Sequence, residues 1–205
     1  MSVAMPSWRG AAHVRNLSAT GLRWAYRLQV FGAHHMGTSG RVIVLCSSEG
    51  VLAGPLLQAI SPRPIHVVAN AAMIEAVPQR VLEAAGGLVP VGATAIRAQL
   101  SAADALADGR AVAVVGSQVD PAWLVAMSHA PVVCVTLVGE QGRVPTDPPR
   151  IGSPIRAYVS AQHRLPTLGD PLRASTRAAV TEKLRQVMTD ADDQALRRAG
   201  LREAS

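Results

Sequence analysis

Lysine, aromatic residues and long hydrophobic runs are all scarce in this chain of 205 residues. Aromatic side chains make up 3% of the sequence while hydrophobic residues reach 49%, so the core must be built from Ala, Val, Leu and Ile. Such an aliphatic core is typical of an α/β domain. The length suits one domain, or one domain with a short appendage.

No apolar stretch approaches the ~20 residues that a membrane-spanning helix needs, because Gly, Pro or a charge interrupts each one. The amino-terminal segment also lacks the apolar core and small-residue cleavage site of a secretory signal. We therefore expect a cytoplasmic protein, soluble or peripheral at the inner face of the membrane.

Cysteine occurs only as Cys46 and Cys134, each within an apolar, strand-like run. Their spacing matches neither a disulfide framework nor a metal motif, which favours a reducing compartment and two buried thiols. We expect no metal ion and no bound cofactor.

Acidic residues are absent from residues 1–48, although the net charge of the chain is +6 and five arginines lie in this segment. Only Lys183 of the 20 basic residues is a lysine, a bias that GC-rich coding explains as well as function does. The acid-free end should nevertheless attract anions. Nucleic acid is not the expected partner, because the other arginines are scattered and are not interleaved with aromatic residues.

Residues 7–30 fit a basic amphipathic helix that Gly10 and Gly21 weaken. In one interpretation this helix lies at a membrane surface, with Trp8 and Trp24 at headgroup depth. In the other it packs its apolar side on its own domain. The pattern does not choose between them.

Further along, short apolar runs alternate with helical patterns, as in α/β folds. We expect strands at 42–46, 65–69, 86–91, 111–115, 130–135 and 155–160, with 65–69 at an edge, helices at 54–60, 73–85 (interrupted at Pro78), 98–107 and 123–127, a loop at 139–154, and one or two helices over 171–198.

The most informative motif is Val42-Ile-Val-Leu-Cys46-Ser-Ser48-Glu-Gly-Val-Leu-Ala53-Gly-Pro-Leu-Leu57, a buried strand that enters a polar turn and then a helix. It resembles the first sequence block of the glycerolipid (lysophosphatidate-type) acyltransferase family. That family has Asn-His-x-x-x-x-Asp here, followed by a small residue, Pro and an apolar pair. Aligning the Gly-Pro ending places Ser48 at the histidine and Ala53 at the aspartate.

Three further blocks follow in the family's order, and the resemblance spans roughly residues 28–160. The second retains Pro90-Val91 but has Gly92-Ala93 where the family has Asp-Arg. In the third, Val115-Gly116-Ser117-Gln118 replaces Glu-Gly-Thr-Arg, and the fourth is a Pro-Val-Val-Pro-Val-like strand over 130–135. The resemblance implies a single-domain mixed sheet flanked by helices.

We divide the chain into a basic amphipathic amino-terminal helical segment (1–30), an acyltransferase-like α/β core (31–170) and a carboxyl-terminal helical segment (171–205). The resemblance also implies a lipid substrate and a thioester, acyl-CoA or an acyl carrier, as possible co-substrate.

Acyl transfer to a hydroxyl needs a general base and a carboxylate that orients it. None of the six histidines is followed five positions later by an acid. We therefore assign no catalytic residue. Candidate substrate-binding residues are Ser47, Ser48, Arg97, Gly116, Ser117 and Gln118, and the amides at Gly116–Ser117 would bind an anion if they open a helix.

Two functions remain open. The first is a catalytically inactive, acyltransferase-like protein of phospholipid or glycerolipid metabolism that binds an acyl lipid or regulates an active enzyme or another subunit. The second is an active acyl-CoA-dependent acyltransferase whose site is rearranged or completed by a partner, for example with Cys46 as acyl acceptor and His34 or His35 as base. A nucleotide-binding protein is disfavoured, because neither Gly-x-Gly-x-x-Gly nor a P-loop is present.

Overall fold

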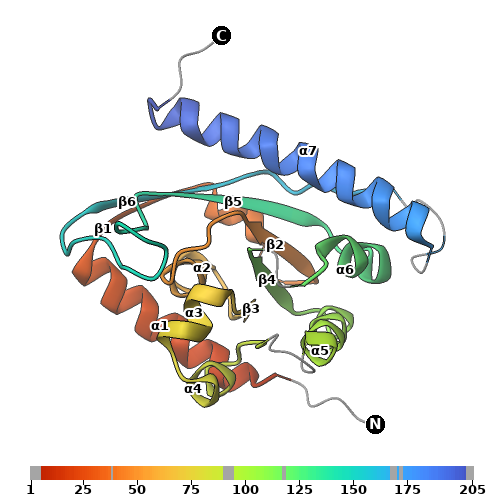
Figure 1. Ribbon diagram of the computed structural model, residues 1–205, viewed down its shortest axis with the longest axis horizontal. Coiled ribbons are helices and arrows are strands. Elements are labelled where there is room, and N and C mark those ends of the chain that lie inside the picture. The colour runs from red at the N-terminus through yellow and green to blue at the C-terminus, as the bar shows by residue number, and fades with distance from the viewer. Residues whose placement is uncertain are drawn as a thin grey trace.

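The computed structural model describes residues 6–37, 39–89, 95–116, 119–166, 170 and 173–201. Within them, six strands form one sheet flanked by helices (Figure 1). The strands are β1 (Arg27–Phe31), β2 (Val42–Cys46), β3 (Ile65–Val68), β4 (Ala111–Val115), β5 (Val132–Val138) and β6 (Pro154–Val159). The helices are α1 (Trp8–Ala25), the 3₁₀ turn η1 (Ala33–Met36), α2 (Ala53–Ile60), α3 (Ala71–Ala76), α4 (Gln79–Ala84), α5 (Ala95–Ala107), α6 (Pro121–Ser128) and α7 (Ala174–Arg198).

The sheet has the order β1-β6-β5-β2-β4-β3 and is mixed. Strands β5, β2, β4 and β3 run parallel, β6 is antiparallel to β5, and β1 is parallel to β6. Every residue of β2 and β4 is buried, as expected for parallel strands covered on both faces. The predicted fold class, a single-domain mixed sheet flanked by helices, is confirmed.

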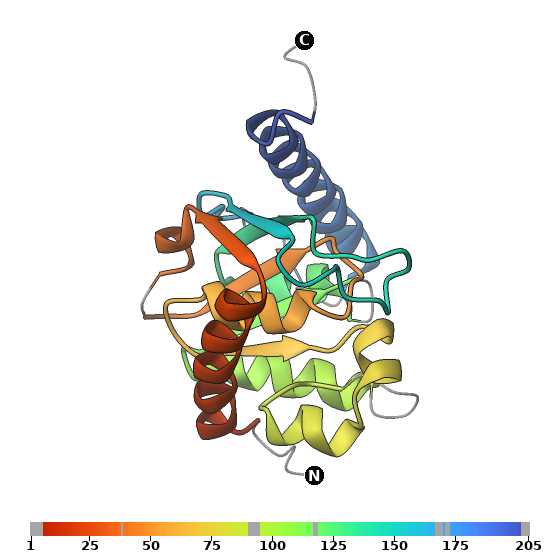
Figure 2. The same ribbon diagram turned by 90° about the vertical axis from the view of Figure 1, so that its left-hand side faces the viewer.

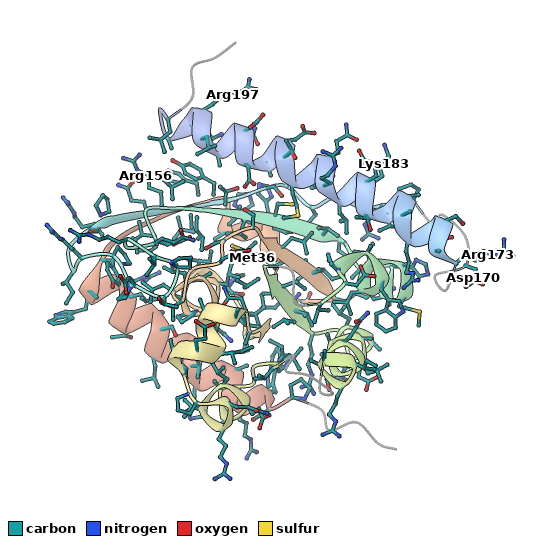
Figure 3. The ribbon with its side chains drawn as sticks, viewed as in Figure 1. Met36, Arg156, Asp170, Arg173, Lys183 and Arg197 are labelled. Atoms are coloured by element: carbon teal, nitrogen blue, oxygen red, sulfur yellow. The ribbon has the colours of Figure 1, made fainter. Side chains whose placement is uncertain are left out.

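Successive side chains of the central strands point to opposite faces. Val42 and Val44 of β2 pack with α2 and α3, whereas Ile43 and Leu45 pack with α5, α6 and α7. Figure 2, read with Figure 1, places α7 at the opposite end of the molecule from α1 and α4. Met36 lies in the interior, and Lys183 lies on the exposed side of α7 (Figure 3).

Most predicted elements are confirmed within a few residues, but the first helix is shorter than predicted. It ends at Ala25, and residues 27–31 form the edge strand β1, whose register pairs Leu28 with Ile155 of β6. Exposed and half-buried residues alternate along this strand, so tertiary pairing overrode a helical pattern that was already imperfect.

One other segment differs from the prediction, and the carboxyl-terminal segment adopts one of its two predicted arrangements. The strand predicted at 86–91 is reduced to one bridge between Leu88 and Val68, and residues 90–91 lie outside the described part of the chain. The carboxyl-terminal segment contains one long helix, α7, which packs Val180 and Leu184 onto the sheet.

Candidate functional site

The carboxyl ends of β2, β3 and β4 meet at one edge of the sheet, where open α/β folds usually bind ligands. The turn after β2 is tied to its neighbours: Gly116 N–H donates to the Cys46 carbonyl (3.2 Å), and Asn70 Nδ2 donates to the Gly50 carbonyl (3.5 Å). A cavity of about 280 Å³ opens here, lined by Glu49, Asn70, Glu75, Gly116, Thr146 and their neighbours. We call it the carboxyl-edge cavity.

Ser48, which the sequence resemblance aligns with the family's histidine, bonds to a carboxylate that follows β5. Its hydroxyl donates to Glu140 Oε1 and accepts from the Gly50 N–H (3.1 Å). Glu140 is buried, and its Oε2 has no hydrogen-bond partner among the described residues. A Cβ at residue 50 would stand 2.9 Å from that oxygen, so glycine there makes room for the carboxylate.

The electrostatics of Glu140 are set mainly by burial. Desolvation raises the pKa of its carboxyl group, and the hydrogen bond from Ser48 opposes this shift. Sequence reasoning missed Glu140, because it falls in the Gly- and Pro-rich loop at 139–154 and lies 92 residues from its partner Ser48. The only sequence signal for Glu140 is that an acidic residue stands two positions after the end of β5.

Ala53, which the sequence resemblance aligns with the family's aspartate, is the first residue of α2 and has no exposed surface. It belongs to the same apolar cluster as Val44 and Leu57. The methyl group contributes packing at this point and no polar function.

Ser47 and Ser48 are adjacent but bond to different elements. Ser47 Oγ donates to Asp192 Oδ2 of α7 (3.3 Å), and Thr136 of β5 donates to the other oxygen of Asp192 (2.5 Å). Asp192 therefore connects α7 to the ends of β2 and β5, and the Ser47 hydroxyl takes part in this structural contact.

The other predicted binding residues are spread out. Gly116 lines the carboxyl-edge cavity, whereas Arg97 is exposed on α5 and lines a different hollow with Glu83 and Gly87. Ser117 and Gln118 lie outside the described residues.

Gly116 does not open a helix, which corrects that expectation. It sits in a turn with φ +68°, and α6 begins later, at Pro121. The amino end of α6 is capped by Asp120, whose Oδ1 accepts from the N–H groups of Ala122 (2.9 Å) and Trp123 (3.2 Å). An acidic side chain thus occupies the position that an anion would take.

The thiol alternative loses support. Burial raises the pKa of both Cys46 and Cys134 to about 12, so each thiol stays protonated near neutral pH. The His35 carbonyl accepts a hydrogen bond from Gln162. The next residue, His163, pairs with Val132 at the start of β5. The turn η1 therefore lies toward the amino ends of the strands. Among the described residues, no group of His, Cys, Asp or Glu is arranged to hold a metal ion.

A second cavity, of about 200 Å³, lies beside the turn that follows Ser48. Its walls are almost entirely apolar and come from that turn, α1, α2, β3, α3, α4 and residues next to them: Val14, Val51, Gly54, Val67, Met73, Val77, Leu82 and Ala85. We call it the apolar cavity. An apolar void of about 150 Å³ suffices to take up benzene, so this one can hold a short hydrocarbon segment.

Comparison with known proteins identifies the fold. A search of solved structures finds the crystal structure of the 1-acyl-sn-glycerophosphate (LPA) acyltransferase PlsC from Thermotoga maritima, with a TM-score of 0.59 and 13% identity, covering 88% of this chain and 79% of that one. No protein-family model and no curated protein matches the sequence.

At this identity the likeness establishes the fold and not the activity. No described helix has the length and apolar character needed to cross a bilayer. The structural comparison thus shows that the chain has an acyltransferase-like α/β fold.

Proposed function

We propose that this chain is an acyltransferase-like protein of lipid metabolism that binds an acyl chain without transferring it. The observation that carries the proposal is the pairing of the apolar cavity with a carboxyl edge that offers no general base of the expected kind: Ser48 and Ala53 occupy the positions that the resemblance assigns to His and Asp. Losing a general base costs on the order of 10² to 10⁴ in rate.

The charge at the carboxyl edge supports a binding role that does not use a phosphate clamp. Glu49 and Glu75 line the cavity, and no arginine or lysine does so among the described residues. Two carboxylates repel the negative charge of a phosphate group. The hydrocarbon part of the ligand is then the part that the protein recognises.

Binding is tested with a fluorescent fatty acid and its displacement by oleoyl-CoA. Ala85 lines the apolar cavity, whereas the adjacent Ala84 is exposed on α4. Ala85→Phe should fill the cavity and weaken binding roughly tenfold or more, while the matched control Ala84→Phe should leave it unchanged. Equal affinity in both variants would contradict the proposal.

A second candidate rests on the bond between Ser48 and Glu140. A hydroxyl that donates to a buried carboxylate is a candidate nucleophile paired with a base, which would give an active enzyme with a rearranged site. Release of free CoA from oleoyl-CoA with lysophosphatidate measures turnover. Turnover that disappears in both Ser48→Ala and Glu140→Gln favours this candidate, whereas tight binding without turnover favours the first.

The amino-terminal helix supports peripheral contact with an anionic membrane at the cytoplasmic face as the source of the lipid. Trp24 is 85% and Leu17 73% exposed, and Ile151 (77%) belongs to the turn whose Gly152 N–H donates to the Ala25 carbonyl (2.7 Å). Arg27 Nε donates to the Gly152 carbonyl (3.0 Å). Exposed apolar side chains beside arginines are the composition that binds anionic lipid surfaces. A lipid-metabolism enzyme as partner is part of the same proposal.

A further inference from the structure

Arg63 is a buried cation whose charge lacks a partner. It is 7% exposed, and its Nη1 donates to the Gly109 carbonyl in a long bond (3.4 Å). Its Nε and Nη2 are buried and have no hydrogen-bond partner among the described residues, and neither ion pair found there includes Arg63. Burial lowers the pKa of the guanidinium, but an arginine remains protonated in proteins.

The two free nitrogens form one edge of the guanidinium. Nε–H and one Nη2–H point in parallel, which is the fork that binds two oxygens of a single carboxylate or phosphate. An unpaired buried charge is costly, so a protein that retains one requires a counter-ion. No such group comes from the described part of this chain, and a bound anion would supply it.

Arg63 lines a cavity of about 430 Å³ together with Trp8, Gly40, Gly109 and Arg110, and Asp108 lies at the same cavity. The guanidinium of Arg110 stands 5.5 Å from the Trp8 ring centroid, and its Nε pairs with Asp108 (2.7 Å). The acid is thereby balanced by Arg110, and the charge of Arg63 remains.

This cavity lies at the amino edge of the sheet. Gly40, Arg63 and Arg110 each come just before a strand, β2, β3 and β4 respectively, and these strands are parallel. Ser48 and Gly116 follow β2 and β4 at the other edge. The two sites are therefore about 17 Å apart, the length of a five-residue strand.

We propose that this cavity, the Arg63 pocket, binds a phosphate monoester, with the Nε/Nη2 edge of Arg63 holding two phosphate oxygens and Arg110, whose charge Asp108 offsets, lying beside the bound group. The free edge has almost no accessible surface. Binding therefore includes a rotation about the last bonds of the Arg63 side chain, which turns this edge toward the cavity. The lining carries two guanidinium groups and one carboxylate, a net positive charge that attracts an anion. The inference does not rest on the proposed function, because it concerns the opposite edge of the sheet.

Thermal unfolding of the full chain tests the pocket, with inorganic phosphate or glycerol 3-phosphate compared against sodium chloride at equal ionic strength. Phosphate stabilises many proteins by exclusion from their surface, so the measured quantity is the difference between variants. Arg63→Met keeps the apolar stem and removes the fork, and Arg97→Met changes an exposed arginine of another hollow. The original chain and Arg97→Met should gain roughly 5 °C or more at a hundredfold excess over Kd, and Arg63→Met should not.

Calorimetric titration separates two sources of the phosphate. Binding of glycerol 3-phosphate alone indicates a soluble ligand, and Arg63-dependent binding to phosphatidic acid vesicles indicates a lipid headgroup; both uphold the site. Should Arg63→Met not fold, Arg63→Lys keeps the charge without the fork and should weaken binding at least tenfold. No binding by the original chain, or equal phosphate stabilisation of the original chain and the Arg63 variant, overturns the inference.

Discussion

The carboxyl edge of β2, β3 and β4 carries Glu49, Glu75 and Glu140, whereas the amino edge of the same strands carries Arg63 and Arg110. Open α/β folds ordinarily hold their ligands at the carboxyl edge. Here the unpaired cation stands at the other edge. Together, the two proposals place acyl recognition and phosphate recognition at separate parts of the molecule.

The largest effect on stability is expected from a substitution that restores a carboxylate of the family at the carboxyl edge. Ala53→Asp should lower the free energy of unfolding by roughly 3–5 kcal/mol, because it places an unpaired charge in a fully buried apolar position. Urea denaturation measures the loss. Ala178→Asp, at an exposed position of α7, is the matched control and should change stability by less than about 0.5 kcal/mol. A stable Ala53→Asp protein would mean that this edge still accommodates a catalytic aspartate.

A smaller effect is expected where α7 contacts the carboxyl edge. Thr136→Val removes the hydroxyl that donates to Asp192 (2.5 Å) and should cost about 1.5–3 kcal/mol, the range for a hydrogen bond to a charged group. Removing Ser47, whose bond to Asp192 is longer (3.3 Å), should cost less. A double-mutant cycle with Asp192→Ala checks that both effects run through that carboxylate. Additive losses would show that Thr136 acts independently of α7.

The pH dependence of stability isolates Glu140. Its pKa is raised in the folded state by burial, so the folded protein holds this proton to higher pH than the unfolded chain does. The proton is bound in both states at low pH, and stability is lost as the pH rises from the unfolded value of about 4.3 through the folded pKa.

Glu140→Gln keeps a hydrogen-bond acceptor for Ser48 and cannot ionise. The free energy of unfolding of the variant should therefore rise relative to that of the original chain as the pH rises above about 4.3. Denaturation midpoints taken from pH 4 to pH 8 measure the gap. A gap that shrinks with rising pH would mean that Glu140 is stabilised in its ionised form.

The sheet was predictable from the sequence because β2 and β4 are buried on both faces and read as unbroken apolar runs, with residues 42–46 and 111–115 matching to the residue. The hydrogen-bond partners of the polar groups were not predictable from the sequence. Glu140 reaches Ser48 only because β5 lies beside β2, and Arg63 looks like part of a turn between two prolines. The bond between Ser48 and Glu140 is made by strand order, which no local pattern encodes.

The smallest effect is expected at Arg97, which sequence reasoning counted among the candidate substrate-binding residues. It is exposed on α5 and does not line the carboxyl-edge cavity, so Arg97→Ala should change stability by less than about 0.5 kcal/mol and should leave acyl binding unaltered. The fluorescent fatty acid titration and urea denaturation together measure both quantities. A clear loss of acyl binding would mean that the bound lipid depends on Arg97, although the folded chain places this arginine in another hollow. That result would remove the contrast between the two edges.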